Sequence, residues 1–236
     1  MKLNASIRFA NLSLLNARFL LHCLKYRFPN MSYSDFTLKQ AKDKLGLQII
    51  EDRDLFSTIK EITISELLSA TLKYNIPLAM AVGTEKARSE LIIANILLEV
   101  RKILNNQISL FSGVIFDVDK ENGLTGFCDF IISQSTEQFY LSAPIITVVE
   151  AKNENIVGGL GQCIAEMYAS NLFNEKEGLR LPSVFGAVTT GNAWKFLRLE
   201  NNTVYIDIKD YYIDAINKIV GILVEMAKQN AYIPIQ

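Results

Sequence analysis

Histidine and cysteine are scarce in this sequence, which has one histidine and three cysteines among 236 residues. A Ser-His-Asp triad and a histidine-ligated metal site both need a well-placed histidine, and usually more than one. The single histidine, His22, lies in an apolar and basic stretch without partner residues, so we expect it to have no catalytic role. Catalysis would therefore depend on carboxylates, amines, hydroxyls and amides.

Paired cysteines and long hydrophobic runs are also missing. Cys23, Cys128 and Cys163 are odd in number, widely spaced and flanked by apolar residues, which is typical of reduced core thiols in a cytoplasmic protein. The apolar run from Leu12 to Leu24 is interrupted by polar and charged residues and is shorter than the roughly 20 residues that span a bilayer. We therefore expect no membrane association. Half of the residues are hydrophobic, which is enough for a folded core.

Acidic residues are missing from the first 34 positions, which carry five basic ones. The rest of the chain contains the other 19 basic side chains and all 25 acidic ones, so its net charge is −6. Three explanations stay open: an organelle-type transit peptide, a basic arm, or a start codon placed too early. We favour Met31 as the true beginning, because the composition of a folded domain starts just after it. We divide the chain into a basic extension that is disordered or precedes the true start (1–30), a helical lead-in (31–82) and the main domain (83–236).

Helical periodicity dominates the first half of the chain. Residues 37–45 and the stretch from Thr63 onward predict short helices, and Pro77 is expected to end this region. The strongest helix signal runs from 84 to 104, with Thr84 as its N-cap. Its core-facing stripe is predicted at steps of three and four residues. That stripe comprises Ala87, Leu91, Ala94, Leu98 and either Val100 or Arg101.

Alternation with a period of two then predicts strands. We expect strands at 110–118, 124–133 and 145–152, with a turn near 120–124 and a helix at 156–172 after the third strand. Three more strands, at 184–190, 194–199 and 204–208, and a closing helix at 211–228 complete the pattern. This order indicates the α/β class, with an α+β mixed sheet, helices on both faces and an extra C-terminal hairpin and helix.

Charged residues occur where the predicted strands should be buried. The third strand ends in Glu150-Ala151-Lys152, and because side chains two apart on a strand share a face, Glu150 and Lys152 project together. Asp129 is a second acidic residue among apolar neighbours, on the preceding strand. Burying such charges costs several kcal/mol unless they are paired or bind a metal, which favours a functional role. The alternative is a surface ion pair between Glu150 and Lys152, with Asp129 in a turn.

The spacing of Asp129, Glu150 and Lys152, 21 and then 2 residues, resembles the motif of the PD-(D/E)xK nuclease superfamily. The order of predicted elements over residues 84–190 also resembles its restriction endonuclease-like αβββαβ core. The proline that usually precedes the first acid is replaced here by Cys128, at a position that the superfamily keeps loosely. In size and pattern the chain is similar to small uncharacterised bacterial members, especially cyanobacterial ones. The resemblance makes residues 83–236 a nuclease-like domain.

A nuclease of this kind hydrolyses phosphodiester bonds with a divalent cation. Two carboxylates at one end of a sheet suit Mg²⁺, a hard ion that prefers oxygen ligands and keeps several waters. We expect Asp129, Glu150 and the backbone carbonyl of Ala151 to hold it, and Mn²⁺ to substitute. The cation lowers the pKa of a water molecule that attacks phosphorus. Lys152 is expected to orient that water or to neutralise charge on the phosphate.

Further candidate residues lie on the predicted helices. Superfamily members often supply another acid from the helix before the strands, and Glu90 lies near the predicted core-facing stripe, with Glu85 and Glu99 as competitors. Gln162 resembles the glutamine that many members carry on the helix after the motif. Glu166 and Tyr168 follow at one and two turns and are candidates for substrate contacts.

Two other segments suggest ligand contacts. Gly158-Gly159-Leu160-Gly161 precedes Gln162 near a helix start, where free N–H groups suit a phosphate, although no nucleotide-binding loop motif is present. Trp194 lies at a strand junction, where packing is the more common role and base stacking the alternative.

The sequence leaves three functions open. The first is a Mg²⁺-dependent endonuclease acting on DNA, the second a non-catalytic nuclease-fold module acting with a partner protein, and the third a hydrolase of small phosphorylated compounds. The net negative body argues against tight DNA binding on its own, but a local basic rim is compatible with the composition. Its candidates are Lys86, Arg88, Arg101, Lys102, Lys195 and Arg198. A homodimer also stays open.

Overall fold

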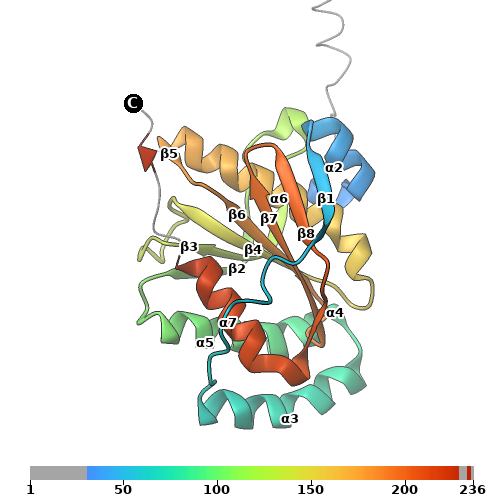
Figure 1. Cartoon of the computed structure of the whole chain (residues 1–236), viewed down its shortest axis with the longest axis vertical. Helices are drawn as coiled ribbons and strands as arrows, with labels where there is room; N and C mark the ends of the chain where they lie inside the picture. The colour runs from blue at the N-terminus through green and yellow to red at the C-terminus, as the bar shows by residue number, and fades with distance from the viewer. Residues whose placement is uncertain (1–30, 229–232, 235–236) are drawn as a thin grey trace, which may run out of the picture.

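The computed structural model describes residues 31–228 and 233–234 (Figure 1). The basic extension 1–30, with His22 and Cys23, lies outside these residues. A mixed sheet of eight strands runs through the molecule in the order β1-β8-β7-β6-β4-β3-β2, with β9 paired to β7. Helices pack against both faces of this sheet (Figure 1), which confirms the predicted mixed α/β class. Among the helices of the described residues, none has the length and apolar character needed to cross a bilayer.

The central strands follow the predicted order. β2 (Ser109–Ile115), β3 (Phe127–Ser133) and β4 (Ile145–Ala151) are antiparallel neighbours. The helix α6 (Ile156–Lys176) then crosses one face of the sheet, and β6 (Val184–Thr189) returns parallel to β4. Every residue of β4 is buried, as expected for a continuously apolar strand that helices cover on both faces.

The C-terminal third adds a hairpin and a helix. β7 (Ala193–Glu200) and β8 (Thr203–Asp207) are joined by a tight turn in which Asn201 has a φ of 49°. The closing helix, α7 (Ile216–Ala227), begins later than the predicted start at residue 211. The reason is that β9 (Tyr211–Tyr212) pairs with β7, which uses these residues for the sheet.

The lead-in is less helical than predicted. It contains α2 (Leu38–Leu45) and α3 (Glu66–Val82), but also β1 (Gln48–Arg53), which pairs parallel with β8 at the edge of the main sheet. No break in the sheet therefore separates residues 31–82 from the rest of the described chain. The expectation that Pro77 ends a helix was wrong, because α3 continues through Pro77 to its left-handed cap at Gly83.

The predicted long helix at 84–104 is interrupted. It consists of α4 (Glu85–Arg88), a π-helical turn η2 (Ser89–Ile93) and α5 (Ala94–Ile103). A π turn takes in an extra residue, which rotates everything after it relative to an unbroken α-helix. The predicted stripe was therefore wrong in part, since Leu98 is exposed. The buried apolar positions are Ile92, Ile93, Ile96, Leu97 and Val100.

Short elements complete the described chain. Single turns of 3-10 helix occur at η1 (Tyr33–Asp35), η3 (Lys120–Asn122) and η4 (Ile213–Ala215). A separate small sheet joins β5 (Leu179–Arg180) and β10 (Ile233–Pro234). The first of these turns is fixed by Tyr33, whose hydroxyl donates a 2.7 Å hydrogen bond to the carbonyl of Phe116.

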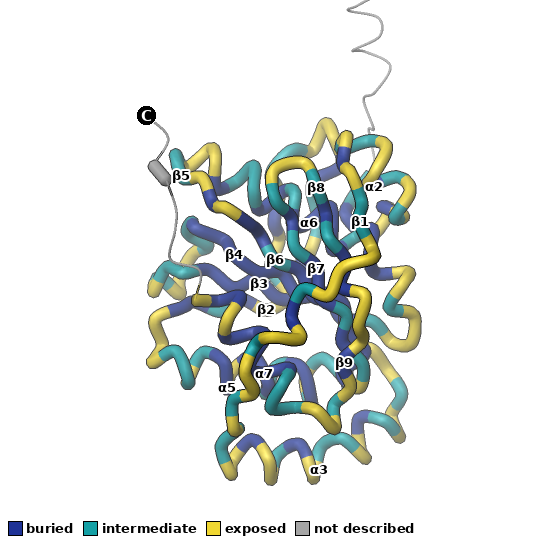
Figure 2. Tube along the Cα trace, in the orientation of Figure 1, coloured by how far each residue is buried: buried dark blue, intermediate teal, exposed yellow. Residues whose placement is uncertain are grey.

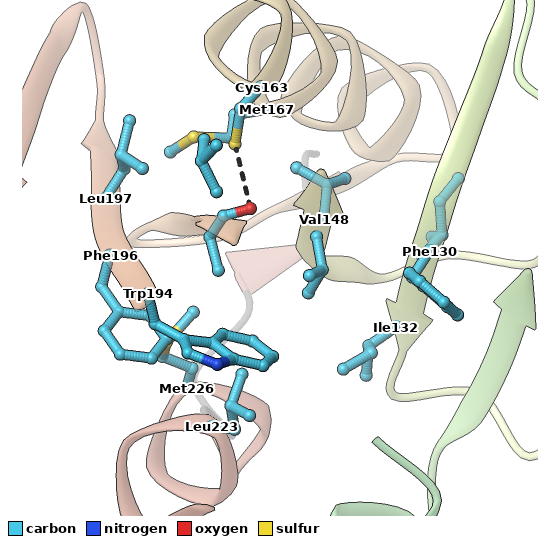
Figure 3. Close-up of a cluster of buried hydrophobic side chains, with 14 of the residues drawn as sticks. Phe130, Ile132, Val148, Cys163, Met167, Trp194, Phe196, Leu197, Leu223 and Met226 are labelled. Carbon is cyan, nitrogen blue, oxygen red and sulfur yellow. Dashed lines mark hydrogen bonds between the residues drawn. The ribbon is translucent and has the colours of Figure 1, made fainter. Parts of the chain in front are cut away.

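The core forms two layers of side chains, one on each face of the sheet. Burial is concentrated along the central strands, as Figure 2 shows. Figure 3 shows Cys163 and Met167 of α6 on one side of the strands, and Leu223 of α7 on the other. Trp194 is fully buried and stacks on Phe196 with 6.1 Å between the ring centroids. Trp194 therefore packs the core, and the alternative of base stacking on it was wrong.

Candidate functional site

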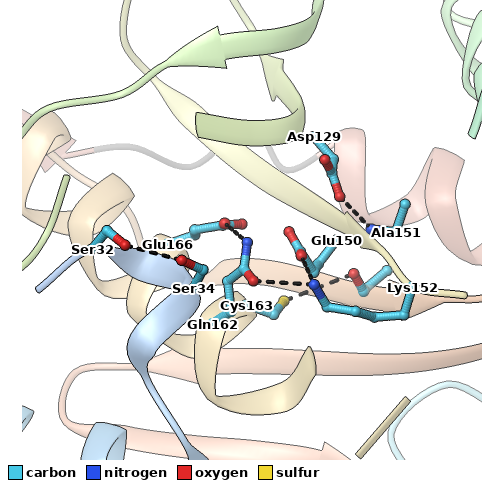
Figure 4. A network of polar contacts seen from close by, with 10 residues as sticks. Ser32, Ser34, Asp129, Glu150, Ala151, Lys152, Gln162, Cys163 and Glu166 are labelled. Atoms are coloured by element: carbon cyan, nitrogen blue, oxygen red, sulfur yellow. Dashed lines mark hydrogen bonds and ion pairs between the residues drawn. The ribbon is translucent and has the colours of Figure 1, made fainter. Parts of the chain in front are cut away.

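The three motif residues lie together where β4 ends (Figure 4). The ammonium of Lys152 forms an ion pair with Oε1 of Glu150. Oδ2 of Asp129 accepts a 2.8 Å hydrogen bond from the backbone N–H of Ala151. Glu150 is only 1% exposed, so the alternative of a surface ion pair was wrong.

Strand register explains why these residues meet. Phe130 of β3 pairs with Val149 of β4 in the antiparallel ladder, so the next position on each strand brings Asp129 beside Glu150. Beyond this point β3 and β4 no longer pair, and the N–H of Ala151 binds the Asp129 side chain instead. On the other side of β4, Lys152 keeps its place because its N–H donates a 2.8 Å bond to the carbonyl of Thr189.

Gln162 joins the motif residues, as predicted from the resemblance. Its Oε1 accepts a 3.1 Å hydrogen bond from the ammonium of Lys152, and its Nε2 donates a 3.1 Å bond to Oε1 of Glu166. The two bonds fix the amide orientation, because one end must accept and the other must donate. Glu166 thus holds the Gln162 oxygen toward Lys152.

Glu166 has a different place from the one predicted. It is fully buried on α6, so it cannot contact a substrate in this conformation. The sequence contained a signal for the contact with Gln162, because Glu166 follows Gln162 by four residues, about one helical turn, among apolar neighbours. Tyr168 lies away from the site. Burial is the main cause that raises the pKa of its hydroxyl, and the charges that raise it further belong to Glu175 and Asp119, which are not site residues.

The site concentrates negative charge away from water. Burial raises the pKa of the carboxyl groups of Asp129, Glu150 and Glu166 above their ordinary values. The pKa of Glu150 is raised further by its acidic neighbours, and Lys152 offsets only part of this effect. Burial by itself would lower the pKa of Lys152, but the Glu150 carboxylate raises it above the ordinary value. A divalent cation would relieve this crowding of carboxyl groups.

The oxygen atoms at the site fit a cation that keeps part of its water shell. Among the described residues, neither Oε2 of Glu150 nor Oε2 of Glu166 accepts a hydrogen bond from a donor group, although both atoms are buried. No three histidine, cysteine, aspartate or glutamate side chains in the described part of the chain are arranged to hold a metal ion together. The oxygen ligands that the site offers are the carboxylates of Asp129 and Glu150 and backbone carbonyls, and oxygen is the ligand type that Mg²⁺ prefers.

Glu90 does not lie at the site, and its prediction was wrong. Its side chain is 65% exposed and pairs with Lys86 at 3.7 Å. The π turn that contains Glu90 directs the neighbouring Ile92 and Ile93 to the core instead. Of the two competitors, Glu99 is buried but accepts a 2.7 Å bond from the N–H of Ser65, at the start of α3. The charge of Glu85 does act on Lys152, raising its pKa.

The glycines at the start of α6 serve close packing. The N–H of Gly158 donates a 2.9 Å bond to the side chain of Asn155, the N-cap, so it is not available to a phosphate. A Cβ atom on Gly159 would lie 2.7 Å from Val188 and 3.0 Å from Cγ of Lys152. A Cβ on Gly161 would overlap the backbone of Phe36. These glycines let α6 approach both Lys152 and the lead-in.

Much of the predicted basic rim is bound within the chain. Arg88 donates a 3.1 Å bond to the carbonyl of Thr190, and Lys195 pairs with Asp210 at 2.6 Å. Arg101 donates a 2.6 Å bond to Asn106. The ion pair with Asp210 offsets the charge of Lys195, and the two hydrogen bonds occupy donors of Arg88 and Arg101 that a phosphate would otherwise bind.

No protein-family model matches the chain, and no curated protein is significantly similar to it. Function is therefore inferred from the residues at the end of β4.

Proposed function

We propose that this protein is a Mg²⁺-dependent nuclease that hydrolyses DNA phosphodiester bonds and belongs to the PD-(D/E)xK superfamily. The observation that carries the proposal is the group at the end of β4, where the buried Glu150 meets the partly buried Asp129 and Lys152. The order of elements supports it, because a helix, three antiparallel strands, a helix and a parallel strand follow one another over α5, β2, β3, β4, α6 and β6.

Asp129, Glu150 and the carbonyl of Ala151 are the proposed ligands. The N–H of Ala151 points to Asp129, and in a strand the N–H and C=O of one residue face the same side, which favours a carbonyl directed toward that carboxylate. When bound, the cation supplies Lewis acidity that activates a water molecule and offsets charge on the phosphate. Mn²⁺ is expected to substitute.

Lys152 supplies the positive charge that the protein's own side chains bring to the site. Its ammonium is held between Glu150 and Gln162 and remains partly exposed, with 23% of its side chain accessible. In this place it can donate a hydrogen bond to a phosphate oxygen or to the attacking water. The buried free thiols of Cys128 and Cys163 are consistent with the cytoplasmic location that we propose.

Cleavage of plasmid and single-stranded DNA tests the proposal. Wild type is expected to cleave only with Mg²⁺ or Mn²⁺, and Lys152→Ala to be about 10²- to 10³-fold slower, the usual loss when one charge-stabilising donor is removed. Lys39→Ala is the matched control, because Lys39 is exposed and pairs with Asp43 within α2. Absence of cleavage together with absence of metal binding would overturn the proposal in favour of a non-catalytic, partner-binding module.

A further inference from the structure

Two apolar side chains on paired strands are exposed beside the site. Phe127 begins β3 and is 65% exposed, and Ile115 ends β2 and is 63% exposed. They are direct partners in the antiparallel ladder, so their side chains stand next to each other. We call this pair the Phe127–Ile115 platform. The pair forms a small apolar surface that solvent can reach.

The platform lies at the end of the sheet that carries the site. β3 runs antiparallel to β4, so the start of β3 lies beside the end of β4, where Glu150 and Lys152 are located. Phe127 precedes Asp129 by two residues, and alternate residues of a strand share a face at about 6 to 7 Å along it. A ligand on the phenyl ring would therefore reach the carboxylates within the length of one nucleotide.

The neighbouring strand leaves this path open. The pairs on either side of Gly113 place it opposite Asp129. A Cβ atom built on Gly113 would have no atom within 4 Å, and its φ of 63° is one that other residues rarely adopt. No β2 side chain therefore screens Asp129 on this side.

The chemistry of the platform fits the face of an unpaired base. A nucleobase stacks on an aromatic ring regardless of its identity, whereas bases inside a duplex already stack on each other. Duplex binding depends mainly on neutralising phosphates, and the chain beyond residue 34 has 19 basic against 25 acidic side chains. Base stacking would supply the binding that phosphate contacts lack.

We propose that the Phe127–Ile115 platform stacks an unpaired base beside the site and makes single-stranded DNA the preferred substrate. This inference rests on the proposed nuclease function. It names the substrate class that the site selects and gives Phe127 a specificity role that is separate from the chemistry of Asp129, Glu150 and Lys152.

Binding of fluorescein-labelled 12-nucleotide DNA, single-stranded or as a duplex of the same sequence, tests the platform. The binding measurements use the Lys152→Ala background with Mg²⁺, so that cleavage does not interfere. Phe127→Ala is expected to raise the Kd for the single strand about 5- to 100-fold, the effect of losing one stacked base, and to leave the duplex Kd unchanged. Phe127→Trp is expected to keep tight binding. Phe139→Ala, at a loop residue that is 99% exposed, is the matched control.

Hydrolysis of bis(p-nitrophenyl) phosphate separates the two proposals, because this small phosphodiester does not need the platform. Equal hydrolysis by wild type and Phe127→Ala, together with weaker single-strand binding, supports both proposals. The platform proposal is overturned if Phe127→Ala binds the single strand as tightly as the parent protein does. It is also overturned if the parent protein binds the duplex more tightly than the single strand. Neither result affects the proposed nuclease function. Absence of hydrolysis of both DNA and the small diester by wild type overturns the nuclease function on which the platform rests.

Discussion

The carboxylate of Asp129 accepts a hydrogen bond from the backbone N–H of Ala151, one residue after Glu150. This bond joins the first acidic residue of the motif to the strand that carries the other two charged residues. It also satisfies a backbone donor at the point where β3 and β4 stop pairing. The same contact therefore stabilises the fold and sets the distance between the two proposed metal ligands.

Substitutions of Asp129 should separate these two roles. Asp129→Asn keeps an oxygen that accepts the Ala151 N–H and removes a charge whose burial is unfavourable, so we expect stability at least equal to that of wild type but no metal-dependent activity. Asp129→Ala leaves the donor unpaired and is expected to cost about 1–3 kcal/mol. Urea unfolding measures the difference. Equal stability of the Asn and Ala variants would show that the hydrogen bond is unimportant.

The contact between Gln162 and Glu166 predicts a kinetic effect. In Glu166→Leu the Gln162 amide loses the acceptor that fixes its orientation, so the ammonium of Lys152 loses a defined partner. We expect kcat on single-stranded DNA to fall about 10-fold with little change in KM, as for other residues that orient a functional group. Glu90→Leu is the matched control, because Glu90 is exposed. A change in KM alone would contradict this positioning role.

Buried acids predict an unusual dependence of stability on pH. The pKa values of Glu150 and Glu166 are raised in the folded state, so folding favours their protonated forms. This contribution is complete below the ordinary pKa of 4.5 and is lost as the pH rises toward the folded values. The free energy of unfolding in EDTA should therefore fall between pH 5 and 8, by up to about 1.4 kcal/mol per pH unit for each group.

Glu166→Gln checks the origin of this slope. The variant cannot titrate at position 166, so its unfolding free energy should depend less on pH than that of wild type over the same range. Urea unfolding at several pH values in EDTA measures both slopes. A wild-type stability that rises with pH, or identical slopes in the two proteins, would contradict the buried-acid account.

The approach of the lead-in to α6 depends on Gly161. Gly161→Ala would force the backbone of Phe36 and Thr37 away from the helix, and we expect a loss of about 1–3 kcal/mol, as for other overpacked positions. Gly158→Ala is the comparison variant, because its Cβ would meet no backbone and would disturb only the Asn155 side chain with its one capping bond to the Gly158 N–H. Thermal unfolding measures both variants. Equal stabilities would show that the lead-in packs loosely.

Local patterns in the sequence were sufficient for the central elements. β4 is almost entirely apolar up to Glu150, and the segment after it has a helical pattern, so both were predicted within a few residues. The meeting of Asp129 with Glu150 was expected from their neighbouring strands and from the resemblance to the PD-(D/E)xK motif. β1 was missed because its residues are mostly polar or charged, as is common at a sheet edge, where only pairing with β8 reveals the strand.

Other features depend on tertiary structure. The π turn at Ser89–Ile93 changes which face of the helix is buried, and periodicity counted at 3.6 residues per turn placed Glu90 wrongly for that reason. The burial of Glu166 follows from the packing of α6 on the sheet. The glycines before Gln162 suggested a phosphate site, but their function is steric and becomes visible only when the neighbouring backbone is placed.

Metal binding at Asp129 and Glu150 is the central claim, and calorimetric titration of the metal-free protein with Mn²⁺ tests it most directly. We predict saturable binding in wild type and in Glu90→Gln, and loss of that binding in Asp129→Asn and Glu150→Gln. Absence of binding in wild type, or equal binding in wild type and Asp129→Asn, would contradict the account.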